Sequence, residues 1–257
     1  MYKKIFYLFI VILFIFITSC TQHKKIIYFH NLPEENDTTQ HYSNNQPSYT
    51  LKSGDIIFIK VISINEEISN MFNINTGAIN YTFYSDAGMY INGFSINDTG
   101  YVNAPVLGHI KVAGFTVDEA QLVVQEKLDK YLKGATAVVK LLTYKITILG
   151  EVNRPGVYTN YNDNITILEA LGMAGDITVY GNKKNILLLR PAKNGIETIR
   201  VNLNDAKLLE TSNFYMLPND ILYVEPVKTK AFRMNAPNIS IILSTITTFI
   251  LVLNFIK

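Results

Sequence analysis

Long apolar runs lie at both ends of this 257-residue chain, and short apolar segments separated by polar turns lie between them. Thirteen consecutive apolar residues occupy positions 5–17, and residues 239–256 contain no charged side chain. The short central segments are rich in Val, Ile, Leu and Tyr and are bounded by turn residues, a pattern that predicts strands. These predicted strands cover residues 56–62, 137–142, 145–150, 157–161, 186–190, 196–203 and 221–224.

Two helix signals interrupt the predicted strands. Thr116-Val117-Asp118-Glu119 and Thr166-Ile167-Leu168-Glu169 are both capping boxes, in which the Thr and Glu side chains can each bond the other residue's backbone N–H. Apolar residues follow both with helical spacing, and Gly134 and Gly175 are placed to end the two helices. The order of strands, helix, strands, short helix and strands predicts an α+β fold with small mixed sheets.

Polar segments predict where the chain turns. Asn194-Gly195 separates two predicted strands and indicates a hairpin. Ser53-Gly54-Asp55, before the first central strand, has a weak echo in Pro218-Asn219-Asp220 before the last, and each predicts a tight turn with a capping Asp. Residues 65–92 are rich in Asn and Tyr without clear periodicity, and we interpret them as an insertion or a long loop.

The N-terminal apolar run has the organisation of a secretion signal. Lys3 and Lys4 precede it, and it ends at Ile17-Thr18-Ser19-Cys20, where Cys20 is the only cysteine of the chain. This sequence resembles a bacterial lipoprotein lipobox, which predicts removal of residues 1–19 and acylation of Cys20, for example with palmitate, for attachment to membrane lipid. The alternative is a plain signal anchor. The polar residues 20–48 are interpreted as a tether.

The C-terminal apolar run predicts a helix, and its polar residues allow two interpretations. Eighteen helical residues span about 27 Å, close to the ~30 Å of a hydrocarbon core. At about 100° per residue, four polar side chains fall within roughly 80° of one another. They are Ser240, Ser244, Thr247 and Asn254. This stripe either faces water in a lumen, or belongs to an ordinary membrane anchor whose hydroxyls bond their own helix.

Composition and motifs exclude several classes of chemistry. A formal net charge of +2 gives no electrostatic case for nucleic acid, and a single cysteine excludes a disulfide framework within the chain. Phosphate-binding, dinucleotide-binding and zinc-protease motifs are missing from the sequence. The four candidate aspartates, Asp55, Asp98, Asp163 and Asp220, all lie in turn-like contexts, and His109 is alone in the central region. We therefore expect no enzyme activity, no metal and no cofactor.

Four stretches in a single order resemble the Wza-type polysaccharide export lipoproteins. They are Tyr49 to Ile57; Asn97-Asp98-Thr99-Gly100 through Pro105 to Gly108 and Val112 to Ala120; Gly150 to Tyr158 with Leu168 to Leu171 and Ala174-Gly175; and Leu217 to Val224. The resemblance implies a small mixed-sheet polysaccharide export domain at 49–143, a soluble-ligand-binding (SLBB) β-grasp domain at 144–228, and a C-terminal transmembrane or amphipathic helix at 238–257. Structural turns are expected at Gly54, Asp55, Gly150, Pro155, Gly156 and Asp220.

The resemblance also implies a function. It predicts an outer-membrane lipoprotein with periplasmic domains that forms a ring-shaped homo-oligomer, commonly an octamer, for export of capsular or extracellular polysaccharide. The implied partners are the polysaccharide chain and an inner-membrane chain-length regulator, tyrosine kinase or polymerase complex. Two departures are evident: only one β-grasp domain fits the chain, and the C-terminal helix is short and has no Trp belt.

Two other functions remain compatible with the sequence. One is a periplasmic adaptor, anchored in membranes at both ends, that links polysaccharide synthesis to a separate pore. The other is a module whose β-grasp fold captures a glycan or another soluble ligand. A ring with a central channel would favour export, whereas a lined pocket in the single chain would favour ligand capture.

Overall fold

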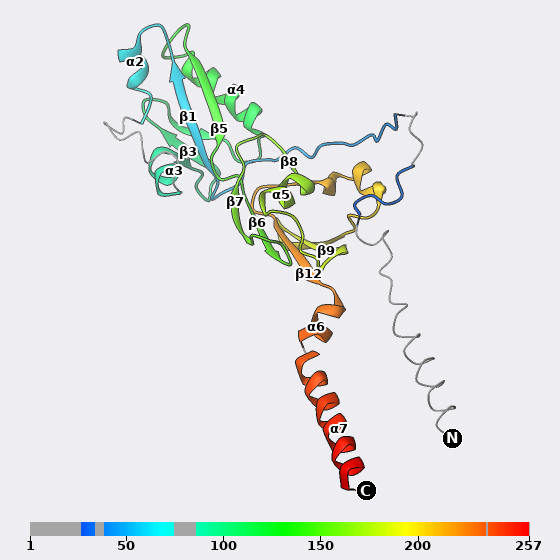
Figure 1. Ribbon diagram of the computed structural model, residues 1–257. Helices are drawn as coiled ribbons and strands as arrows, with labels where there is room; N and C mark the ends of the chain where they lie inside the picture. Colours follow the sequence, from blue (N-terminus) through cyan, green and yellow to red (C-terminus); the bar gives the residue numbers. More distant parts are fainter. Residues whose placement is uncertain (1–26, 34–38, 75–85, 235, 257) are drawn as a thin grey trace.

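Two β-rich units and a C-terminal helical extension make up the computed structural model, which describes residues 27–33, 39–74, 86–234 and 236–256 (Figure 1). The first unit, here called the export unit, holds one hydrophobic core built from residues between Leu51 and Val139. The second, the β-grasp unit, holds another built from residues between Tyr144 and Val224. Leu141 packs against both cores, so the two units meet at this residue.

The export unit contains an antiparallel sheet in the order β2-β1-β5 and a separate β3-β4 hairpin. Its elements are β1 (Ile56–Ile62), α2 (Glu66–Asn70), α3 (Asp86–Asn92), β2 (Phe94–Ser95), β3 (Tyr101–Ala104), β4 (Gly108–Lys111), α4 (Val117–Leu128) and β5 (Thr136–Leu141). Alternate residues Ile57, Ile59 and Val61 of β1 are buried, as expected for a strand with one face on a core. Helix α4 packs along β5 through buried Ala120, Val124 and Leu128.

The β-grasp unit is built on a five-stranded sheet in the order β10-β9-β12-β6-β7, in which only β12 and β6 run parallel. Helix α5 supplies buried Ile167, Ala170 and Leu171 to its core. Its elements are β6 (Lys145–Gly150), β7 (Gly156–Thr159), β8 (Ile165–Thr166), α5 (Ile167–Met173), β9 (Gly181–Ala192), β10 (Gly195–Val201), the 3-10 turns η2 (Ala206–Glu210) and η3 (Ser212–Phe214), β11 (Tyr215–Met216) and β12 (Ile221–Pro226).

Both predicted capping boxes form, at Thr116 with Glu119 and at Thr166 with Glu169. Helix α4, however, ends at Leu128, six residues before Gly134. The side-chain amide of Gln125 donates to Ala135 O (2.9 Å) and accepts from Ala137 N (2.7 Å). Near its end, the helix is therefore bonded to the segment that leads into β5.

Other sequence expectations are corrected by the structure. The segment 65–92, interpreted as a loop, contains α2, capped by the Asn65 side chain, and α3; residues 75–85 lie outside the described part. The β9–β10 hairpin forms, but its two loop residues are Lys193 and Asn194, since Ala192 pairs with Gly195. The positive φ falls on Gly195 (+138°), the first residue of β10.

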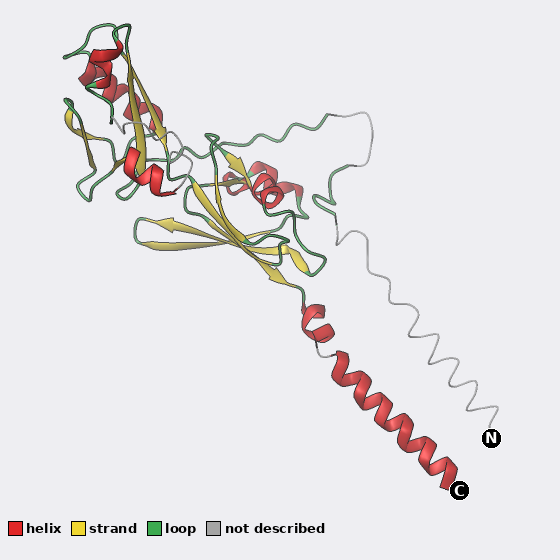
Figure 2. Cartoon of the chain, turned by 60° about the vertical axis from the view of Figure 1, so that its left-hand side comes forward, coloured by secondary structure: helices red, strands yellow, loops and turns green. Residues whose placement is uncertain are grey.

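The C-terminal extension consists of α6 (Lys228–Met234) and α7 (Ala236–Ile256). Helix α7 points away from both units (Figures 1 and 2). The predicted C-terminal helix therefore exists, but its prediction as a membrane-spanning element is not supported. Within the described ranges, none of the helices combines the length and the apolar character needed to cross a membrane.

Candidate functional site

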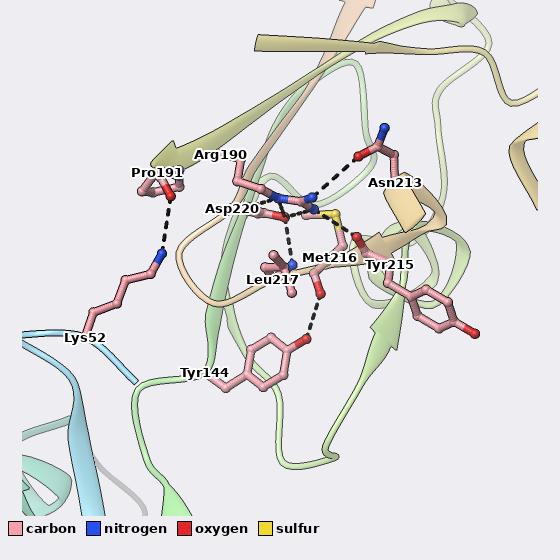
Figure 3. Close-up of polar contacts among 9 residues, drawn as sticks. All are labelled: Lys52, Tyr144, Arg190, Pro191, Asn213, Tyr215, Met216, Leu217 and Asp220. Carbon is pink, nitrogen blue, oxygen red and sulfur yellow. Dashed lines mark hydrogen bonds and ion pairs between the residues drawn. The ribbon is translucent and has the colours of Figure 1, made fainter. Parts of the chain in front are cut away.

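The joint between the two units is a three-residue connection, Leu142-Thr143-Tyr144, that is bonded on both sides. Leu142 N donates to Ile56 O (2.8 Å), and the Thr143 hydroxyl accepts from Ile56 N (3.2 Å). On the other side, the buried Tyr144 hydroxyl donates to Met216 O (2.8 Å; Figure 3). The short connection is therefore hydrogen-bonded to both units.

Two turns of the same geometry flank this joint. In each, an Asp N–H donates to the carbonyl three residues earlier, and the Asp carboxylate accepts from that earlier residue's N–H: Asp55 with Lys52 (3.2 and 2.9 Å) and Asp220 with Leu217 (3.1 and 2.7 Å). The third turn position has positive φ in both, +87° at Gly54 and +69° at Asn219. The predicted turns and the capping role of both aspartates are therefore present in the structure.

Asp220 also carries a buried ion pair that the sequence did not indicate. Its carboxylate is fully buried and lies 2.7 Å from Nη2 of Arg190, whose side chain is 12% exposed (Figure 3). Arg190 Nε donates to the same carboxylate, and its Nη2 also donates to Tyr215 O (3.0 Å). Burial raises the pKa of Asp220 and Arg190 opposes this change, while burial and the Asp220 charge raise the pKa of Tyr144 to about 12.

Lys52 extends from the first turn toward the second unit. Its Nζ donates to Pro191 O of β9 at 3.4 Å (Figure 3). The same Nζ lies 5.4 Å from the centre of the Tyr49 ring. The Tyr49 hydroxyl in turn donates to Asp55 (2.8 Å), whose pKa is raised by burial. A polar contact across the joint thus connects the Asp55 turn with the strand that carries Arg190.

Helix α6 is fixed to the β-grasp unit by two polar contacts. Lys230 Nζ forms an ion pair with Glu151, and that carboxylate also accepts from the Thr178 hydroxyl (2.9 Å). Arg233 donates to the Tyr180 hydroxyl (2.9 Å), and its guanidinium lies 5.7 Å from the same ring. The Lys230 ammonium holds the pKa of Glu151 below its usual range. These contacts hold α6, the helix before α7, against the β-grasp unit.

Helix α7 exposes most of its apolar side chains, with 65% exposure at Phe249 and 92% at Phe255. The predicted lumen residues Ser240, Ser244, Thr247 and Asn254 are all exposed on this helix as well. The hydroxyls of Ser244 and Thr247 donate to carbonyls of their own helix, at 2.8 Å each, as do those of Thr245 and Thr248. In the single chain these four hydroxyls therefore bond backbone carbonyls of α7, as the interpretation of the stripe as part of an ordinary membrane anchor expected.

The predicted turn glycines differ in how closely they are packed. Gly150 has a φ of +88°, and an added Cβ would collide with Val224 O and approach Tyr223 Cε2 to 2.9 Å. Gly156 begins β7, and its added Cβ would find its nearest neighbour, Tyr158, only at 3.9 Å. The steric demand expected at both positions is therefore present at Gly150 and not at Gly156. Pro155 lies in the connection between β6 and β7.

Three of the remaining candidate residues, His109, Asp98 and Asp163, lie in the described part of the chain. Cys20 lies outside the described residues, and His109 is exposed on β4. Asp98 accepts from the Ser53 hydroxyl (2.9 Å), and Asp163 forms an exposed ion pair with Lys140 (3.8 Å). In the parts of the chain that the structure describes, no three His, Cys, Asp or Glu residues cluster as metal ligands would.

A cavity of about 520 Å³ opens in the export unit beside the β3–β4 hairpin. It is lined by Ile74, Phe94, Asn103, Ala104, Pro105, Val106 and Gly108. Val106 has a φ of +61° between Pro105 O and Leu107 N, which are hydrogen-bonded at 2.6 Å. The interpretation as a ligand-capture module expected a lined pocket in the single chain. This cavity is such a pocket, and it lies in the export unit and not in the β-grasp unit.

Comparison with known proteins matches both units. Residues 43–142 match the family described as "Polysaccharide biosynthesis/export protein", and residues 144–224 match the SLBB domain. The chain is 26% identical over 200 residues to the EPS I polysaccharide export outer membrane protein EpsA of Ralstonia solanacearum, covering 76% of this chain and 52% of that protein. Its counterpart from Ralstonia nicotianae is 27% identical over 182 residues, covering 69% and 47%. The chain spans about half the length of these curated relatives.

An export unit is thus joined directly to one β-grasp unit, and a helix with an exposed apolar surface follows. The first matched family and both relatives are described as polysaccharide export proteins. Together, the two matched domains and these relatives support the identification of a Wza-type polysaccharide export protein.

Proposed function

We propose that this protein is a non-enzymatic lipoprotein of the outer membrane that exports capsular or extracellular polysaccharide from the periplasm. The observation that carries the proposal is the pair of matched domains, export and then SLBB, over residues 43–224. The Ralstonia relatives, described as outer membrane proteins of polysaccharide export, support both the substrate class and the location. Cys20 is the residue that we assign to lipid attachment.

We assign the passage to a homo-oligomeric ring, since a hydrophilic sugar chain needs a wet path across a hydrocarbon layer. Two features of the single chain support association of copies. Helix α7 has uncovered apolar side chains, among them Phe249 and Phe255. The outer face of the five-stranded sheet carries exposed Val157, Leu149 and Tyr223, bordered by the Arg200–Glu225 ion pair. Apolar patches of this kind with a polar rim are typical of protein interfaces.

The joint supports the same function. A ring keeps its passage open only if each copy holds a fixed shape, and the bonded connection at Thr143 and Tyr144 provides such a link between the units. We further propose that the polysaccharide arrives from an inner-membrane chain-length regulator, kinase or polymerase complex.

The decisive experiment combines imaging with an export assay. Detergent-extracted, lipidated protein is imaged by negative stain, and extracellular polysaccharide is measured in a strain that lacks the gene and carries it on a plasmid. A ring with a central channel, together with restored export that fails in the Cys20→Ala variant, is the expected result. Particles without a channel, in a strain that exports normally without the gene, would overturn the proposal.

A further inference from the structure

Residues 28–32, here called the N-terminal strap, are bound to the β-grasp unit, although the sequence indicated a free tether there (Figure 1). Phe29 N donates to Leu203 O (2.9 Å), and His30 N donates to Asn204 O (3.0 Å). Tyr28 and Phe29 pack against the core of this unit. The strap is therefore a turn bound to the segment that follows β10, and it does not run free as a linker would.

Side chains at both ends of the strap fasten it. The Tyr28 hydroxyl donates to Asp176, and the Lys183 ammonium lies 4.0 Å from the centre of the Tyr28 ring. At the other end, Asn31 uses both atoms of its amide. Its Nδ2 donates to Asp205 Oδ1 (2.9 Å), and its Oδ1 accepts from Ala206 N (2.8 Å).

Because the chain between Cys20 and the strap is short, a bound strap limits how far the β-grasp unit can lie from Cys20. Eight residue steps separate Cys20 from Tyr28, which extend to at most about 28 Å at 3.3–3.6 Å each. If the strap were free, the next contact that the structure describes would be that of Asn44, whose Nδ2 donates to Leu209 O (2.7 Å), and the same arithmetic over 24 steps gives a reach of about 80 Å. A strap that stays bound thus shortens the maximum reach from Cys20 about threefold.

We propose that the strap holds the end of the β-grasp unit that carries η2 against the lipid surface in which Cys20 is anchored. The partner of this surface is a phospholipid bilayer, and the export unit is the part farther from it. This inference rests on the proposed acylation of Cys20. It adds that the tether between Cys20 and the strap, and not the segment between the strap and the export unit, sets the distance to the membrane.

The test places one fluorophore on Lys207→Cys, an exposed position of η2, in the full-length lipidated chain. Energy transfer to labelled headgroups is measured in vesicles of phosphatidylethanolamine and phosphatidylglycerol. A flexible insertion of about 20 residues between Gln22 and His23 should lower the transfer by about twofold or more, since it adds up to ~70 Å of reach. The same insertion between Thr39 and Gln40 is the matched control and should leave the transfer unchanged.

A double variant of the strap removes the side-chain contacts of Tyr28 and Asn31 without changing the length of the chain. Tyr28→Ala with Asn31→Ala should lower the transfer as the first insertion does, and should speed hydrogen exchange at the Phe29 and His30 amides. Acyl labelling of the starting protein, checked first, separates a failure of the lipidation proposal from a failure of this one. Equal effects of the two insertions, or no effect of either insertion or of the strap variant, would overturn the inference.

Discussion

Gly150 lies where β6 leaves the sheet against the backbone of β12, with a φ of +88°. A Cβ there would enter the space of Val224 O, and a non-glycine residue would also carry the cost of a left-handed backbone, about 1 kcal/mol. We expect Gly150→Ala to lower the free energy of unfolding by more than about 2 kcal/mol, because the two costs combine. Gly156→Ala is the matched control and should change it little. Urea unfolding of both variants checks this, and an equal loss at the two positions would refute it.

Arg190 has a side chain that is only 12% exposed and pairs with a buried carboxylate, so it should contribute more to stability than a cation in a surface ion pair. Arg190→Ala leaves the Asp220 carboxylate buried without its ion pair, which typically costs about 3–5 kcal/mol. Arg200→Ala removes the exposed pair with Glu225 and should cost at most about 1 kcal/mol. Thermal and denaturant unfolding distinguish the two variants. Similar stability of both would show that the buried pair contributes nothing beyond the exposed one.

At the residue scale, contacts between residues close together along the chain could be predicted from the sequence, and contacts between residues far apart along it could not. Asp55 and Asp220 were predicted as turn aspartates because a turn is encoded within four residues. Arg190 lies 30 positions from Asp220, and no spacing rule connects β9 with the turn before β12. Gly156 was grouped with Gly150 because both flank a turn, but only the fold shows that Val224 O approaches one of them.

At the element scale, the Glu151–Lys230 pair should make the attachment of α6 depend on pH. Lys230 holds the pKa of Glu151 below its ordinary value of 4.5, so the stabilisation is present above that value and is lost as the pH falls through the lowered pKa. A nitroxide on Met234→Cys should be immobile at neutral pH and become mobile on acidification. With Glu151→Gln it should be mobile at both.

The control for this experiment is Glu126→Gln, which removes an exposed ion pair between Glu126 of α4 and Lys130 just after that helix, far along the chain from α6. It should leave the nitroxide spectrum of residue 234 unchanged at every pH. An immobile label in the Glu151→Gln variant would show that Arg233 and Tyr180 alone are sufficient to hold α6.

Strong local signals predicted the elements well, and the failures have physical causes. Strands β1 and β6 and both capping boxes are where periodicity and cap chemistry placed them. Helix α4 ends early because Gln125 binds the chain that returns into β5, a contact ten residues away. Helices α2 and α3 were missed because segments of five and seven residues carry too little periodicity to recognise.

At the scale of the whole molecule, three attachments converge on the β-grasp unit. The strap binds it at Leu203 and Asn204, α6 binds it at Glu151, and the joint connects it to the export unit. Composition could not show this, because a polar segment such as 20–48 is typical of a free tether until its partners are known. The β-grasp unit is therefore the part of the molecule that contacts the strap, α6 and the export unit.

Assembly of copies should depend on one side of α7 and tolerate change on the other. Phe249 lies opposite the stripe of Ser240, Ser244, Thr247 and Asn254, and it is 65% exposed in the single chain. If neighbouring copies cover this side, an unpaired ammonium placed there would be buried at a cost of several kcal/mol. We expect Phe249→Lys to abolish the oligomer in sedimentation of the detergent-extracted protein.

Thr247→Lys is the matched variant, because the same charge then enters a stripe that we assign to the water-filled side of the ring. It should sediment as the intact oligomer while changing the amount of exported polysaccharide. A cysteine at 247 should react with a small water-soluble thiol reagent in the assembled protein, and a cysteine at 249 should not, since a neighbouring copy would cover it. Equal reactivity, or equal loss of assembly in both lysine variants, would remove the polar-lumen arrangement and leave α7 without a distinct inner side.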